Sequence, residues 1–203
     1  MPAGGAGILP ARPVVWASRP HPAGILQEPH ITSAICSTMN PAEPHDVMAC
    51  RLEHDLDARP GWAHPSCMAI LDGLTLEQAT WRPGPGRRCI WEYVRHMLRW
   101  RQFVAHRMEG GRDPEPEDQW PAIPLPDDPD APTQWAADLA GLRSTTDRIA
   151  AALRTTPVEA RHPSPAHAHL PAWISPLGVL QHDSYHLGQI ALLRGLQGMP
   201  PIE

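Results

Sequence analysis

The sequence lacks any apolar run close to the roughly 18 residues that a membrane-spanning helix needs, and its mean hydropathy is −0.34. It also lacks a surplus of basic residues, because its formal net charge is −5. A protein that contacts nucleic-acid phosphates needs a basic face. We therefore expect neither a membrane nor a nucleic acid among its partners.

Cysteine is scarce, and no two of the four residues form a C-x-x-C pair; they are Cys36, Cys50, Cys67 and Cys89. A chain of 203 residues with so few cysteines is not typical of a disulfide framework. A cysteine metal site is not indicated either. We expect reduced thiols in a cytoplasmic protein.

Proline is abundant, and its density is high in residues 1–45. There it interrupts every candidate for the apolar core of about 7–15 residues that a secretory signal requires. Two interpretations stay open. The segment is a disordered extension, or translation begins at Met39 or Met48 and residues 1–38 do not belong to the native protein. In both cases we place the folded domain at residues 46–203.

Apolar residues in that domain recur at spacings of three and four, which is typical of helices. The pattern predicts helical segments at about 46–73, 88–109, 133–153 and 175–198, the first of them broken at Pro60-Gly61. Capping signals are Thr133 and Ser175 as N-caps, and Thr75 with Gln78 as a capping box before one further turn.

Four such segments without strand signals predict an all-α fold, an antiparallel four-helix bundle. A proline-rich acidic linker, residues 112–132, separates the second segment from the third. Its length allows a crossover connection.

Two histidines, His182 and His186, lie four residues apart in the fourth segment, so they share one face of a helix. Val179, Gln189 and Leu193 lie on the same stripe, which a bundle would bury. Two imidazoles buried without partners would be costly, and either hydrogen bonds or a bound metal ion would remove that cost.

A third histidine, His96, lies on the inward stripe of the second segment, between Tyr93 and Trp100. Together with His182 and His186 it would complete a three-histidine site with open coordination positions, as catalytic metal sites have. Zn²⁺ fits such a site best, and Ni²⁺ or Fe²⁺ also suits imidazole.

The stretch HDSYHLGQIALLR, from His182 to Arg194, resembles the signature of the DinB/YfiT-like metalloenzyme superfamily. WAHPS at 62–66, IWEYVRH at 90–96 and QWP at 119–121 resemble other elements of that superfamily. The resemblance covers about residues 46–198. It implies a four-helix bundle, commonly a homodimer, with one metal ion held by the histidines at positions 96, 182 and 186.

Two further residues share the faces of these histidines and are candidates for a supporting role. Gln189 could orient a ligand or simply satisfy a backbone carbonyl, and Glu92 could hold an imidazole or act as a base or be a solvated acid at a helix start. Asp183 and Tyr185 are expected to make interhelical or surface contacts. His162, His167 and His169, in the loop before the fourth segment, have no assigned role.

A metal ion bound by the three histidines would activate water or a low-molecular-weight thiol against a small electrophilic substrate. The reaction would be hydrolysis or, as the resemblance suggests, transfer of a thiol. Two alternatives are a non-catalytic metal-binding module for sensing or stress response, and histidines with a purely structural role.

Overall fold

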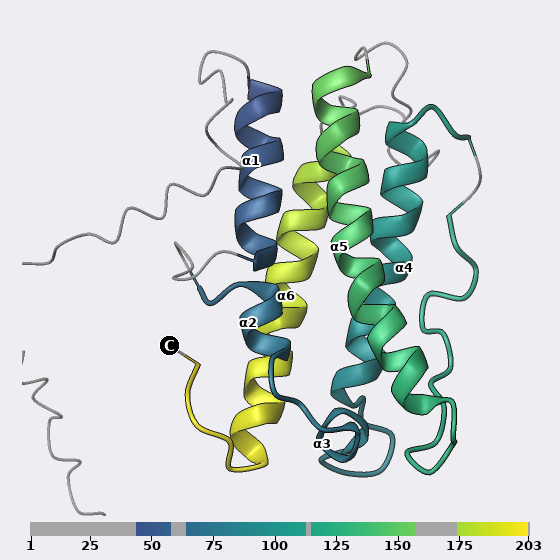
Figure 1. Cartoon of the computed structure of the whole chain (residues 1–203), viewed down its shortest axis with the longest axis vertical. Helices are drawn as coiled ribbons and strands as arrows, with labels where there is room; N and C mark the ends of the chain where they lie inside the picture. Colours follow the sequence, from purple (N-terminus) through teal and green to yellow (C-terminus); the bar gives the residue numbers. More distant parts are fainter. Residues whose placement is uncertain (1–43, 58–63, 113–114, 157–173, 203) are drawn as a thin grey trace, which may run out of the picture. The chain divides into compact units, whose positions relative to one another are not determined.

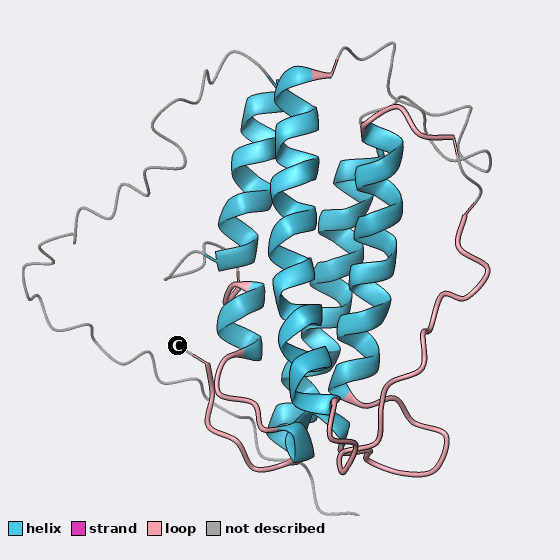
Figure 2. Cartoon of the chain, turned by 45° about the vertical axis from the view of Figure 1, so that its right-hand side comes forward, coloured by secondary structure: helices cyan, strands magenta, loops and turns pink. Residues whose placement is uncertain are grey.

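The computed structural model describes residues 44–57, 64–112, 115–156 and 174–202, and in these it contains six helices and no strand. Four helices are long: α1 (Pro44–Asp57), α4 (Ile90–Met108), α5 (Ala131–Thr155) and α6 (Ile174–Leu196). The short helices α2 (Cys67–Leu71) and α3 (Leu76–Thr80) lie between α1 and α4 in the chain (Figures 1 and 2). The predicted all-α, four-helix bundle is confirmed. The expectations for residues 1–43 lie outside the described residues.

Ion pairs show how α1 and α5 run relative to one another. Arg154, at the end of α5, binds Glu53, and Arg143, in its middle, binds Asp57 at the end of α1. The later residue of α1 therefore pairs with the earlier residue of α5, so these two neighbouring helices are antiparallel (Figure 1).

By contrast, α4 and α5 are parallel neighbours. Trp91, at the start of α4, donates to Asp138, and Glu109, just after α4, pairs with Arg148 further along α5. A parallel pair requires the connection to return along the bundle, and the linker from α4 to α5 does so in Figure 1. The bundle thus contains the crossover that the long linker allowed, and its neighbours are not all antiparallel.

Local capping signals predict one helix start correctly and two others incorrectly. The capping box of α3 is confirmed. The Thr75 hydroxyl accepts from the backbone N–H of Gln78, and the backbone N–H of Thr75 donates to the Gln78 side chain. Thr133 is not the N-cap of α5, since the helix already includes Pro132, whose fixed φ suits a first helical turn. Ser175 likewise lies inside α6 rather than before it.

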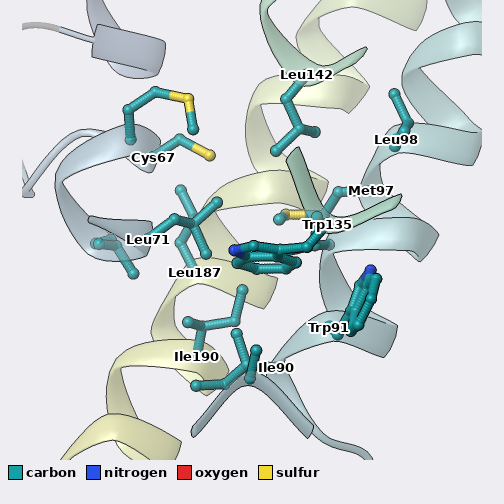
Figure 3. Close-up of a cluster of buried hydrophobic side chains, with 14 of the residues drawn as sticks. Cys67, Leu71, Ile90, Trp91, Met97, Leu98, Trp135, Leu142, Leu187 and Ile190 are labelled. Atoms are coloured by element: carbon teal, nitrogen blue, oxygen red, sulfur yellow. The ribbon is translucent and has the colours of Figure 1, made fainter. Parts of the chain in front are cut away.

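One face of α5 is buried and packs into the core. Figure 3 shows its Trp135 against Trp91 of α4, with ring centroids 5.4 Å apart in an edge-to-face arrangement that aromatic pairs prefer. Leu142 and, from α6, Ile190 are fully buried in the same cluster. A second cluster around Leu52, Ile149 and Leu153 packs α1 against α5 and the far half of α4. None of the described helices is long and apolar enough to cross a membrane.

The cysteines correct one expectation. Cys67 and Cys89 are free and buried, and burial raises the pKa of their thiols to about 12 and about 11. Cys50, however, is disulfide-bonded, so the expectation of a reduced thiol is wrong there. Cys36 lies outside the described residues.

Candidate metal centre

The antiparallel packing of α4 and α6 brings the three predicted histidines together. His182 and His186 follow one another on a single face of α6, with ring centroids 4.5 Å apart. His96 faces them from α4, with its centroid 4.9 Å from that of His182 and 4.8 Å from that of His186. One nitrogen from each ring lies within 4.8 Å of the other two, so the group could hold a metal ion.

The Nδ1 atom of each imidazole faces an oxygen. His96 Nδ1 lies 2.6 Å from the carbonyl oxygen of Gln119, and His186 Nδ1 lies 2.6 Å from Gln189 Oε1. His182 Nδ1 lies 3.2 Å from Asp183 Oδ1. Because these oxygens accept hydrogen bonds, the proton of each neutral ring belongs on Nδ1. The lone pair is then on Nε2, which is the usual arrangement of a metal-binding histidine.

The separation between the ring nitrogens fits a shared cation. The Nε2 atoms of His96 and His182 are 3.0 Å apart. If both carry lone pairs, no hydrogen bond joins them and they repel unless a positive charge lies between them. Ligand nitrogens at about 2.0–2.1 Å from a tetrahedral Zn²⁺ are about 3.3 Å apart. The donor set and the spacing of this pair of nitrogens therefore suit a divalent transition metal.

Burial favours the neutral rings that a metal requires. His96 and His186 are buried, and desolvation lowers the pKa of both, that of His186 to about 4. The side chain of His182 is 28% exposed, which leaves one side of the triad open to solvent.

Aromatic side chains wall the triad. Trp120, from the linker before α5, stacks on His96 with centroids 3.8 Å apart and planes 6° from parallel. Tyr93 and Tyr185 flank His186, and Trp100 lies beside His182. Trp120 thus packs the linker back on the bundle.

The linker also supplies the carbonyl that holds His96, and sequence reasoning missed this contact. A backbone oxygen carries no residue signature, so no motif could have indicated the role of Gln119. Arg95 secures the segment by donating to the carbonyl of Ala122, and its guanidinium binds Asp138 and Gln134 of α5. The wall of the triad is thereby anchored to two helices.

The two candidates for a supporting role, Gln189 and Glu92, have different surroundings. Gln189 contacts His186, as one of its two interpretations expects. The carboxylate of Glu92 accepts from Arg82, Arg88 and the backbone of Cys89, which holds its pKa below the usual range despite its burial. Glu92 therefore caps α4 and neutralises two arginines. The loop histidines, His162, His167 and His169, lie outside the described residues.

Replacing Gln189 by alanine is expected to weaken metal binding about 10-fold, because the proton on His186 Nδ1 loses its acceptor. A competition titration with a chromophoric chelator measures the dissociation constant. Gln181→Ala, at an exposed position of α6, serves as the matched control. An unchanged constant for Gln189→Ala would show that Gln189 does not orient the ligand.

The sequence matches the model of the DinB superfamily over residues 64–190. This match includes α2 to α5, the linker and the two histidines of α6. Searches of curated proteins and of solved structures gave no significant match. Because the matched residues make up more than half of the chain and contain the triad, the chain belongs to the DinB superfamily.

Proposed function

We propose that the protein is a metal-dependent enzyme in which His96, His182 and His186 hold one divalent ion, Zn²⁺ in the first instance. The substrates would be a low-molecular-weight thiol or water and a small electrophile. The observation that carries the proposal is the common arrangement of the three rings. In each, Nδ1 faces an oxygen, and the lone pair of Nε2 is left for the metal ion. Three ligands leave at least one coordination position open, as in catalytic zinc sites.

When bound, the ion would lower the pKa of a coordinated thiol or water and polarise an electrophile. The chain contributes three neutral imidazoles, so it leaves the double positive charge of the ion uncompensated. Burial of His96 and His186 limits the access of water around that charge. Both features favour an anionic nucleophile at the open position.

Between the two nucleophiles, the carboxylates near the triad favour a thiol. Glu92, four residues before His96, is held by two arginines, and Asp183, next to His182, is held by Arg101. Neither is free to take a proton from water. A thiol ionises with a pKa near 8.5 and needs little help, and a coordinating thiol loses its proton outright.

The substrate contacts would come from the aromatic wall. Trp120, Tyr93 and Trp100 offer apolar surface around the triad, which suits an electrophile with an apolar part.

We also propose a homodimer. Tyr185, Leu192 and Leu196 are exposed along α6, and a second copy would bury such apolar side chains.

A turnover assay tests this function. Protein purified without a histidine tag is stripped of metal, reloaded with Zn²⁺, Ni²⁺ or Fe²⁺, and offered thiols together with alkyl halides, epoxides or activated esters. We expect consumption of an electrophile that requires both metal and thiol. Full metal loading with no turnover of any thiol or ester would instead favour a non-catalytic sensing or stress-response module. Failure to retain metal would leave the histidines with a structural role.

A further inference from the structure

A buried ion pair joins α4 to α6 directly beside the triad. Arg101 Nε lies 2.5 Å from Asp183 Oδ2, and both side chains are about 95% buried, at 4% and 5% exposed. Arg101 also donates to Thr146 Oγ1 and to the carbonyl of Leu142 on α5. The guanidinium therefore has partners on two helices, and the position of the Asp183 carboxylate is fixed from outside its own helix.

The other oxygen of the same carboxylate faces the metal site. Asp183 Oδ1 lies 3.2 Å from Nδ1 of His182, while Oδ2 is occupied by Arg101. Of the three rings, His182 alone has an anionic acceptor, since His96 faces a backbone carbonyl and His186 faces an amide. A carboxylate behind a ligating imidazole fixes its tautomer and increases its basicity as a donor.

We propose that Asp183, held in place by Arg101, is the positioning residue that keeps the Nε2 lone pair of His182 directed at the metal. This inference rests on the proposed metal site. His182 needs such support more than its partners do, because it is the most exposed of the three rings. Arg101 has a second effect: by engaging Oδ2 it keeps the carboxylate from turning to bind the ion itself.

The competing explanation is that Asp183 only neutralises Arg101 and so only stabilises the fold. Metal affinity separates the two roles, because it is measured on folded protein. Asp183→Asn keeps the size of the side chain but removes its charge. The control is Thr146→Val, which disturbs the same arginine from α5 and does not touch a histidine.

We expect Asp183→Asn to weaken Zn²⁺ binding about 10- to 100-fold in a chelator competition. Thr146→Val should lower the denaturant midpoint and leave the dissociation constant within about two-fold of the parent. A folded Asp183→Asn protein with an affinity within two-fold of the parent would overturn the proposal. A parent chain that binds no Zn²⁺ would instead refute the proposed function.

A second readout does not depend on whether the Asp183→Asn protein folds. In the metal-free parent, ¹⁵N chemical shifts should show His182 protonated on Nδ1, with the signals assigned by their loss in His182→Gln. A metal-free parent with the proton on Nε2 would refute the role of Asp183 even if Asp183→Asn cannot be purified. In a folded Asp183→Asn protein we expect the Nε2-protonated form to appear.

Discussion

Replacing His186 by alanine is expected to reduce the metal content from about one ion per chain to almost none. The change removes one of three converging nitrogens, and the two that remain hold an ion much more weakly. Loss of a residue that only supports a ligand costs about 10- to 100-fold in affinity, so loss of the ligand itself should cost more than about 100-fold. Elemental analysis of protein purified without a histidine tag measures the occupancy, and chelator competition measures the affinity.

The matched control for this change is His64→Ala. His64 is partly buried beside the same helix, where Nε2 lies 3.4 Å from Ser184 Oγ, but it is not one of the three converging histidines. Its replacement should leave both metal content and affinity unchanged. Circular dichroism of both variants confirms that the helices persist. Unchanged metal content in the His186→Ala protein would place the ion elsewhere or leave the histidines with a structural role.

The features of the fold that could be predicted are local ones. The helical segment predicted at 133–153 and the capping box of Thr75 each depend on residues within a few turns of one another. The parallel direction of α4 and α5 depends on contacts such as Trp91 with Asp138, which are 47 residues apart. No periodicity in a single segment contains that information, so the sequence allowed a crossover without requiring one.

In the candidate site, too, local features could be predicted and features that depend on distant contacts could not. The spacing of His182 and His186 puts both on one helix face whatever the rest of the chain does. His96 was chosen as third member from its place on the inward stripe of its own segment and was supported by the resemblance, but only tertiary packing brings α4 to α6. Gln119 acts through its backbone, and Asp183 through an arginine 82 residues away, so neither role left a pattern in the sequence.

Replacing Arg101 by methionine is expected to destabilise the protein strongly, by about 3–5 kcal/mol. The variant leaves the Asp183 carboxylate buried on the inner side of α6 without its guanidinium partner. Methionine is of similar length and apolar, so the loss reports the unpaired charge more than a cavity. Urea unfolding of metal-free protein measures it, because a bound ion would otherwise add its own stabilisation.

Two further variants show whether burial of the unpaired charge causes the loss. Arg148→Met breaks the exposed ion pair with Glu109, and it should cost less than about 1 kcal/mol because solvent screens that pair. The double variant Arg101→Met with Asp183→Leu removes both buried charges and should recover most of the stability. A loss below about 1 kcal/mol for Arg101→Met alone would contradict the prediction. If the double variant is stable but still binds Zn²⁺ weakly, the ion pair is dispensable for folding, and the Asp183 carboxylate is required at His182.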